Sequence, residues 1–84
     1  MSEQNIPENL YESPNVANRI KERAKESQIS LKDLLEECGL GRNTISHMLH
    51  GRALASDSLA RVADYLDVSV DFLLGRTDKP EINR

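Results

Sequence analysis

With 84 residues, of which 38% are hydrophobic, the chain can bury one small core, and this excludes an organisation in two domains. Its single cysteine excludes an internal disulfide, and no apolar run is long enough for a signal peptide or a membrane span, so we expect a cytoplasmic protein without a membrane partner. The formal net charge of −3, taken alone, argues against a polyanionic partner such as a nucleic acid.

The first segment, residues 1–12, is polar and has no helical repeat of apolar residues, so we expect a flexible acidic tail. It contains Glu3, Glu8 and Glu12 and no basic residue. Removing these three from the 14 acidic residues of the chain leaves 11, which equals the 11 basic residues. The rest of the chain is therefore neutral, and the distribution of charge along it decides where an anion can bind.

A first helix is predicted from about Pro14 to Glu26. Ser13 fits an N-cap, and Pro14 fits the first helical position, where the missing amide hydrogen of proline costs nothing. Apolar residues then recur at every fourth position, as expected for one buried face: Val16, Ile20 and Ala24.

A second helix is predicted to follow Ser30, whose side chain can act as its N-cap. Asp33 stands three residues later, an arrangement similar to a capping box. Gly39 comes directly after the apolar stripe, where a helix end needs a residue that tolerates positive φ, and the next helix is expected soon after it. The stripe itself consists of Leu31, Leu34, Leu35 and Cys38.

The third predicted helix runs from about Arg42 to His50, within a window that contains no carboxylate between Glu37 and Asp57. The spacing i, i+3, i+4 predicts a buried stripe against the preceding helix, made of Ile45, Met48 and Leu49. The opposite side has polar, uncharged or basic residues: Arg42, Asn43, Ser46, His47 and His50. Gly51 ends the helix. Such a surface suits the phosphates and base edges of duplex DNA.

Two more helices are predicted after this window. The fourth starts near Ser56, with this serine or its neighbour as the cap, and ends at Asp67, a residue type that tolerates a left-handed backbone. The fifth starts after Ser69 and is closed by Gly75. Their apolar residues are Leu59, Val62, Ala63, Leu66, Phe72, Leu73 and Leu74.

No strand-like pattern or internal repeat occurs in the sequence. We therefore predict an all-α protein, with one compact five-helix domain between flexible N- and C-terminal tails. The expected organisation is an acidic tail over residues 1–12, a folded domain over residues 13–75 and a polar tail over residues 76–84.

Several of these segments together resemble a known family. The stretch LLEECGLGRNTIS at residues 34–46, the later Gly51 and the stretch VSVDFLL at residues 68–74 are similar to the helix-turn-helix domain of phage repressor and Cro-like (XRE-type) transcription regulators. The resemblance covers residues 16–75. It implies a repressor-like five-helix fold and a sequence-specific regulator, a repressor, whose third helix reads the major groove of an operator in double-stranded DNA.

The resemblance also implies which side chains would contact DNA. Relatives commonly reach base edges from the start and the exposed face of the third helix, and the residues there have suitable chemistry, since arginine can form two hydrogen bonds with guanine and asparagine two with adenine. The predicted base-reading residues are Arg42, Asn43, Ser46 and His47. The predicted phosphate contacts are Gly41, Thr44 and Arg52, because amide groups at a helix N-terminus and a loop arginine suit a phosphate oxygen.

Three positions depart from the family pattern. Relatives often have glutamine at the position of Leu31, where it contacts a phosphate, and leucine cannot make that hydrogen bond. The position of Leu35 is often alanine, so we expect a slightly wider crossing of the second and third helices. Gly41 replaces a frequent serine or threonine. These changes suggest a modest intrinsic affinity for DNA.

The same part of the chain contains residue types that occur in metal sites and in catalytic pairs. His47, His50 and Cys38 do not have the spacing of a structural zinc motif, and adjacent Ser46 and His47 do not face one another on a helix. We therefore expect no metal site, no catalytic residue, no cofactor and no small-molecule ligand.

Two functional hypotheses follow from the sequence. The favoured one is a DNA-binding regulator, and the alternative is a helical protein-interaction module of the antirepressor or antitoxin type, whose third helix would meet an acidic protein surface. One short recognition helix offers few base contacts, so we expect a homodimer on an inverted-repeat operator. The candidate dimer residues are Tyr65, Phe72 and Leu73, although Phe72 and Leu73 could equally close the monomer core.

Overall fold

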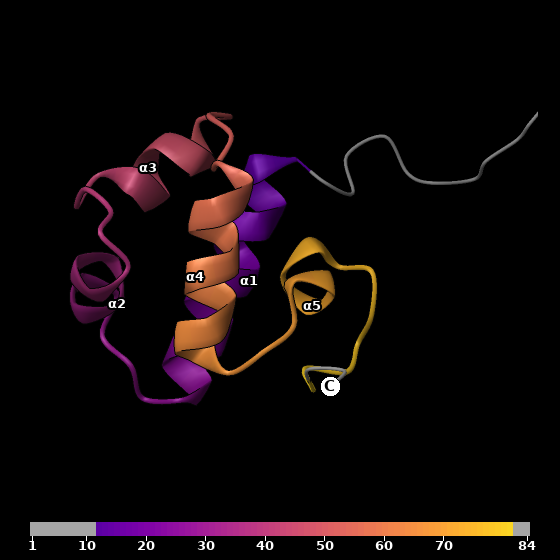
Figure 1. Cartoon of the computed structure of the whole chain (residues 1–84). Coiled ribbons are helices and arrows are strands. Elements are labelled where there is room, and N and C mark those ends of the chain that lie inside the picture. The colour runs from indigo at the N-terminus through magenta and orange to yellow at the C-terminus, as the bar shows by residue number, and fades with distance from the viewer. Residues whose placement is uncertain (1–11, 82–84) are drawn as a thin grey trace, which may run out of the picture.

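The computed structural model describes residues 12–81, so most of the predicted acidic tail and the last three residues lie outside the described part. Within that part the chain forms five helices and no strand, which confirms the predicted all-α fold (Figure 1). The helices are α1 (Ser13–Glu26), α2 (Leu31–Glu37), α3 (Thr44–Leu49), α4 (Ser56–Leu66) and α5 (Val70–Leu74). No helix of this part is long and apolar enough to cross a membrane.

The two longest helices, α1 and α4, pack against each other in the middle of the domain (Figure 1). Helix α3 lies across one end of this pair and packs mainly against α1, whereas α2 packs against α4. Helix α5 contacts both long helices on the side away from α2. The short helices therefore surround the long pair, and the pair provides the core on which each of them is held.

The core is formed by apolar side chains at helical spacing. The predicted stripe of α1 is confirmed, since Val16, Ile20 and Ala24 are buried. In α4 the predicted residues Leu59, Val62, Ala63 and Leu66 are buried as well. Burying such side chains stabilises a small domain by about 1.5 to 3 kcal/mol each. Further buried apolar residues are Ala17, Leu34, Leu35, Cys38, Ile45, Met48, Val68 and Leu73.

Most predicted helix ends are confirmed. The side chain of Ser30 accepts a hydrogen bond from the amide of Asp33 at 3.1 Å. Asp67 ends α4 with φ +58°, in the left-handed region that aspartate tolerates better than most residues. Gly39, with φ +72°, follows α2 in the same conformation. These local signals can be identified from the sequence because each depends on residues close together in the chain.

The predicted N-cap of α1 was wrong, and in α4 the N-cap is the neighbour of Ser56 and not Ser56 itself. Helix α1 begins one residue earlier than expected, so Ser13 is its first residue and Glu12 its N-cap. The carbonyl of Glu12 accepts hydrogen bonds from the amides of residues 15 and 16, which fixes this start. Ala55 is the N-cap of α4 and offers no side-chain acceptor, while the carboxylate of Asp57 accepts from the amide of Ser58 at 2.9 Å.

The segment after α5 returns to the domain over its described part. The amide of Ser69 donates to the carbonyl of Pro80 at 3.0 Å. The amide of Arg76 donates to the carbonyl of Asp71 at 2.8 Å, and its guanidinium lies 3.5 Å from the carboxylate of Asp71. Residues 76–81 therefore make backbone contacts around α5.

Candidate nucleic-acid interface

A tight turn precedes α3 and determines where the helix begins. The amide and the hydroxyl of Thr44 both donate to the carbonyl of Gly41, at 3.0 and 2.6 Å. This double hydrogen bond closes a turn that includes Arg42 and Asn43, so α3 begins at Thr44 and not at Arg42. The predicted start was therefore two residues early, because local polarity does not distinguish a turn from the first turn of a helix.

Two side chains of α3 are buried, Ile45 and Met48, at 9% and 2% exposure. Leu49, which we expected in the same stripe, is 38% exposed. The expectation that α3 packs mainly on α2 is also wrong, because its main neighbour is α1. A helix of six residues that crosses the end of another helix buries only a narrow face, and Leu49 lies at the edge of that face.

The four predicted base-reading residues are all exposed and lie in one continuous segment of the surface. Arg42 and Asn43 occupy the turn, and Ser46 and His47 lie on α3 opposite its two buried side chains. The amide of His47 donates to the carbonyl of Asn43 at 2.9 Å, so these two residues are one helical turn apart. The surface they form contains no carboxylate of its own.

The predicted phosphate contacts differ in what they can offer. Arg52 is exposed just beyond α3, and its amide donates to the carbonyl of His47 at 2.9 Å. Gly41 is exposed and its surroundings leave room for a side chain. The hydroxyl hydrogen of Thr44 is used by the carbonyl of Gly41, so this hydroxyl has no hydrogen to donate to a phosphate. Thr44 closes the turn instead.

Two of the family departures are explained by burial. Leu31, at the position where relatives often have glutamine, is half-buried and packs against the core. Leu35 is 5% exposed and is part of the core. Both side chains therefore stabilise the domain, and a leucine side chain has no polar hydrogen to donate to a phosphate.

Sequence reasoning did not assign a binding role to His50, which is exposed at the end of α3. The ring Nδ1 of His50 lies 2.8 Å from the carbonyl of Ser46. Gly51, with φ +100°, turns the chain away from the helix, and its amide donates to the carbonyl of Met48 at 2.9 Å. A polar ring at the end of an otherwise apolar and basic helix was the only signal in the sequence.

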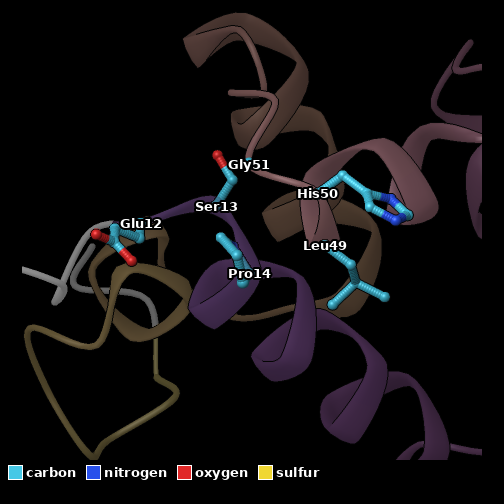
Figure 2. Close-up of a pocket in the computed structure, with 6 residues that line it drawn as sticks. All are labelled: Glu12, Ser13, Pro14, Leu49, His50 and Gly51. Carbon is cyan, nitrogen blue, oxygen red and sulfur yellow. The ribbon is translucent and has the colours of Figure 1, made fainter.

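A shallow groove separates the end of α3 from the start of α1 (Figure 2). It is lined by Glu12, Ser13, Pro14, Leu49, His50 and Gly51. Figure 2 shows that the ring of His50 extends away from Ser13 and Pro14, and that Glu12 lies on the far side of these two residues. The exposed part of Leu49 contributes an apolar side chain to the groove.

Arg61 joins α2 to α4 and was also missed. Its Nε donates to the carbonyl of Cys38 at 3.1 Å, and its Nη2 donates to the hydroxyl of Ser58 at 3.2 Å. Burial raises the pKa of the Cys38 thiol, although the charge of Arg61 opposes this effect. The carbonyl at the end of α2 is thus capped from α4, by a residue 23 positions away that no local pattern could identify.

The three candidate dimer residues have different environments. Tyr65 is 37% exposed, and Phe72 is half-buried against the core. Leu73 is fully buried, so it offers no surface for a second chain and must be withdrawn as a contact residue. The reason is that α5 packs against both α1 and α4, and Leu73 fills the space between them.

Among the residues that the structure describes, no three histidine, cysteine, aspartate or glutamate side chains are grouped closely enough to hold a metal ion.

Comparison with known families matches residues 19–79 to the Cro/C1-type helix-turn-helix DNA-binding domain. No curated protein and no solved structure matches the chain. The matched residues include all of α2, α3, α4 and α5 and most of α1. The chain therefore belongs to the Cro/C1-type helix-turn-helix DNA-binding family and is a DNA-binding protein of transcription regulation.

Proposed function

We propose that the protein is a sequence-specific repressor that reads the major groove with α3 and the turn before it. The observation that carries this proposal is the set of exposed residues between Arg42 and Arg52, none of which has a carboxylate. A helix of this size fits the major groove, and a surface without acidic groups avoids repulsion by the phosphates on both sides of the groove.

Each exposed residue has a proposed role that follows from its chemistry. Arg42 donates two hydrogen bonds to a guanine, and Asn43 forms two hydrogen bonds with an adenine. Ser46 and His47 reach neighbouring base edges from the next turn. Arg52 contacts a phosphate, because it is exposed in the loop after the helix.

The test starts by selecting bound fragments from random duplex DNA. Arg42→Ala and Asn43→Ala are each expected to weaken binding to the selected duplex by about 1 to 3 kcal/mol and to relax the preference at one base pair. Arg76→Ala removes the same charge far from α3 and serves as the matched control for Arg42→Ala. If both α3 variants bind the selected duplex like the parent, the assignment is wrong. If the parent prefers no duplex, the protein-interaction module becomes the better hypothesis.

We also propose that the protein binds as a homodimer to an inverted repeat. Helix α3 has only six residues, too few for tight specificity by itself. Tyr65 and Phe72 remain the candidate contact residues, since both keep some exposed surface. Analytical ultracentrifugation on the selected duplex is expected to give two chains per site, with half-sites about 10 base pairs apart. One chain on a site without inverted symmetry would contradict the homodimer.

A further inference from the structure

We infer that His50 is a phosphate-contacting residue whose contact forms only when its ring is protonated, so that DNA binding by this protein depends on pH. The inference rests on the proposed function and adds a residue and a regulatory property to it. It starts from the hydrogen bond of the His50 ring, which fixes which of its two nitrogen atoms can face DNA.

The hydrogen bond assigns the proton on the His50 ring. Nδ1 lies 2.8 Å from the carbonyl oxygen of Ser46. A carbonyl oxygen can only accept a hydrogen bond, so Nδ1 must be the protonated nitrogen and the donor. The neutral ring then has a lone pair and no hydrogen at Nε2. Protonation adds a hydrogen at Nε2 and leaves the bond to Ser46 in place.

A phosphate oxygen distinguishes these two forms. It accepts hydrogen bonds and cannot donate one, so it has no favourable contact with the lone pair of neutral Nε2. The protonated ring instead offers both an Nε2 hydrogen and a positive charge. Histidine is the side-chain type that commonly changes its charge near neutral pH, so a contact that needs the charged ring should be stronger at low pH than at high pH.

The position of His50 favours a backbone contact over a base contact. It is exposed at the end of α3, and it lies two residues before Arg52, the proposed phosphate contact. Figure 2 shows its ring extending away from the start of α1. The ring is held by its own helix and still has one nitrogen available to solvent.

The charged groups around His50 agree with this assignment. His47 lies one turn earlier on α3, Arg52 follows the helix, and Glu12 lines the other side of the groove. The carbonyls at the end of α3 are already used, since those of His47 and Met48 accept from the amides of residues 50–52. A bound phosphate would thus meet cationic groups and few unpaired acceptors.

The test measures the affinity for the selected duplex and for a random duplex of the same length at pH 5.5 and pH 8.0, at constant ionic strength. The parent protein is expected to bind both about two- to fivefold more tightly at pH 5.5, the range for one exposed ion pair. The slope of log K against log salt should also be steeper by about 1 at pH 5.5. His50→Gln should bind as the parent does at pH 8.0. Lowering the pH to 5.5 should change neither its affinity nor its salt slope.

Two control variants test whether a titratable group other than His50 causes the pH effect. His47→Gln tests the other histidine of the chain, and Glu12→Gln tests the nearest carboxylate; both should keep the pH effect. The inference is overturned if His50→Gln keeps the effect, if His47→Gln loses it, or if the parent shows none. Selective binding that is independent of pH would overturn this inference alone, whereas absence of duplex preference at both pH values would overturn the proposed function with it.

Discussion

Helices α3 and α5 are both short, with six and five residues, and neither is long enough to be stable alone. They end in the same way. Each is followed, directly in α5 and after His50 in α3, by a glycine with positive φ and then by an arginine, whose amide donates to a carbonyl five residues earlier. Their N-terminal ends differ. The amide of Phe72 in α5 is capped by the side chain of Ser69 at 3.0 Å, and Asp71 lies in the first turn, whereas α3 has no side-chain cap and no acidic residue there.

This difference agrees with the proposal that α3 faces DNA. An acidic residue in the first turn stabilises a helix through its dipole by about 0.3 to 1 kcal/mol, but the same charge repels phosphate. Helix α5 faces the protein and uses this stabilisation. Helix α3 is held instead by Ile45 and Met48 in the core and by the turn between Gly41 and Thr44.

The largest expected effect comes from two variants of α3, one with a carboxylate on its buried side and one with a carboxylate on its exposed side. Ile45→Asp puts an unpaired charge in the core and should cost about 3 to 5 kcal/mol, most of the stability of a small domain. Ser46→Asp adds the same charge at an exposed position, so the domain should stay folded but lose DNA binding. Thermal melting by circular dichroism and a binding titration check both variants. A normal melt for Ile45→Asp, or normal binding for Ser46→Asp, would mean that the faces of α3 are reversed.

The next effect concerns the glycine that ends α5. Gly75 has φ +82°, a conformation that strains a residue with a side chain, and a side chain there would also displace the guanidinium of Arg19. Gly75→Ala should therefore lower the free energy of unfolding by about 1 to 2 kcal/mol. Gly41→Ala is the matched control, because Gly41 lacks positive φ and has room for a methyl group. Urea unfolding measures both, and equal stability of the two variants would contradict the left-handed end of α5.

The N-terminal ends of the two helices give a smaller effect. Ser69→Ala removes the cap of α5 and should cost about 1 kcal/mol of unfolding free energy. Asn43→Ala should cost less than this, because the Asn43 side chain makes no capping hydrogen bond. Urea unfolding with both variants measures the difference. A larger loss for Asn43→Ala would show that α3 is capped in solution.

The smallest effect on stability comes from the arginines that follow the two glycines. Arg76 pairs with Asp71, whereas none of the described carboxylates pairs with Arg52. Both alanine variants should change stability by less than about 0.5 kcal/mol, because exposed ion pairs contribute little. Only Arg52→Ala should lower the slope of log K against log salt, by about 1, and weaken all DNA sequences alike. An unchanged slope would remove Arg52 from the proposed interface.

Features that depend on neighbouring residues could be predicted from the sequence. The caps at Ser30 and Ser69, the left-handed Asp67 and the buried stripes of α1 and α4 were all correct. Each of these depends on residue type and helical spacing within a few positions. The exposure of Ser46 and His47 could be predicted for the same reason, because their helix face follows from the positions of Ile45 and Met48.

Features that depend on distant residues could not be predicted. The bond from Arg61 to the end of α2 and the contact of Arg19 with the carbonyl of Leu73 join positions 23 and 54 residues apart. Leu49 was expected to be buried and is exposed, and Leu73, for which a dimer contact and a core position were both open, is buried. Only the packing of α3 and α5 on α1 decides which apolar side chain is covered. The sequence shows which face of a helix is apolar, but it does not show how much of that face a neighbouring helix covers.

The narrow attachment of α3 has a consequence for how this protein can change its target. Since the buried contacts of the helix come from two side chains, substitutions at Arg42, Asn43, Ser46 and His47 leave the core untouched. Under the proposed function, new operator preferences are therefore accessible through single exposed substitutions, each testable without a compensating change elsewhere.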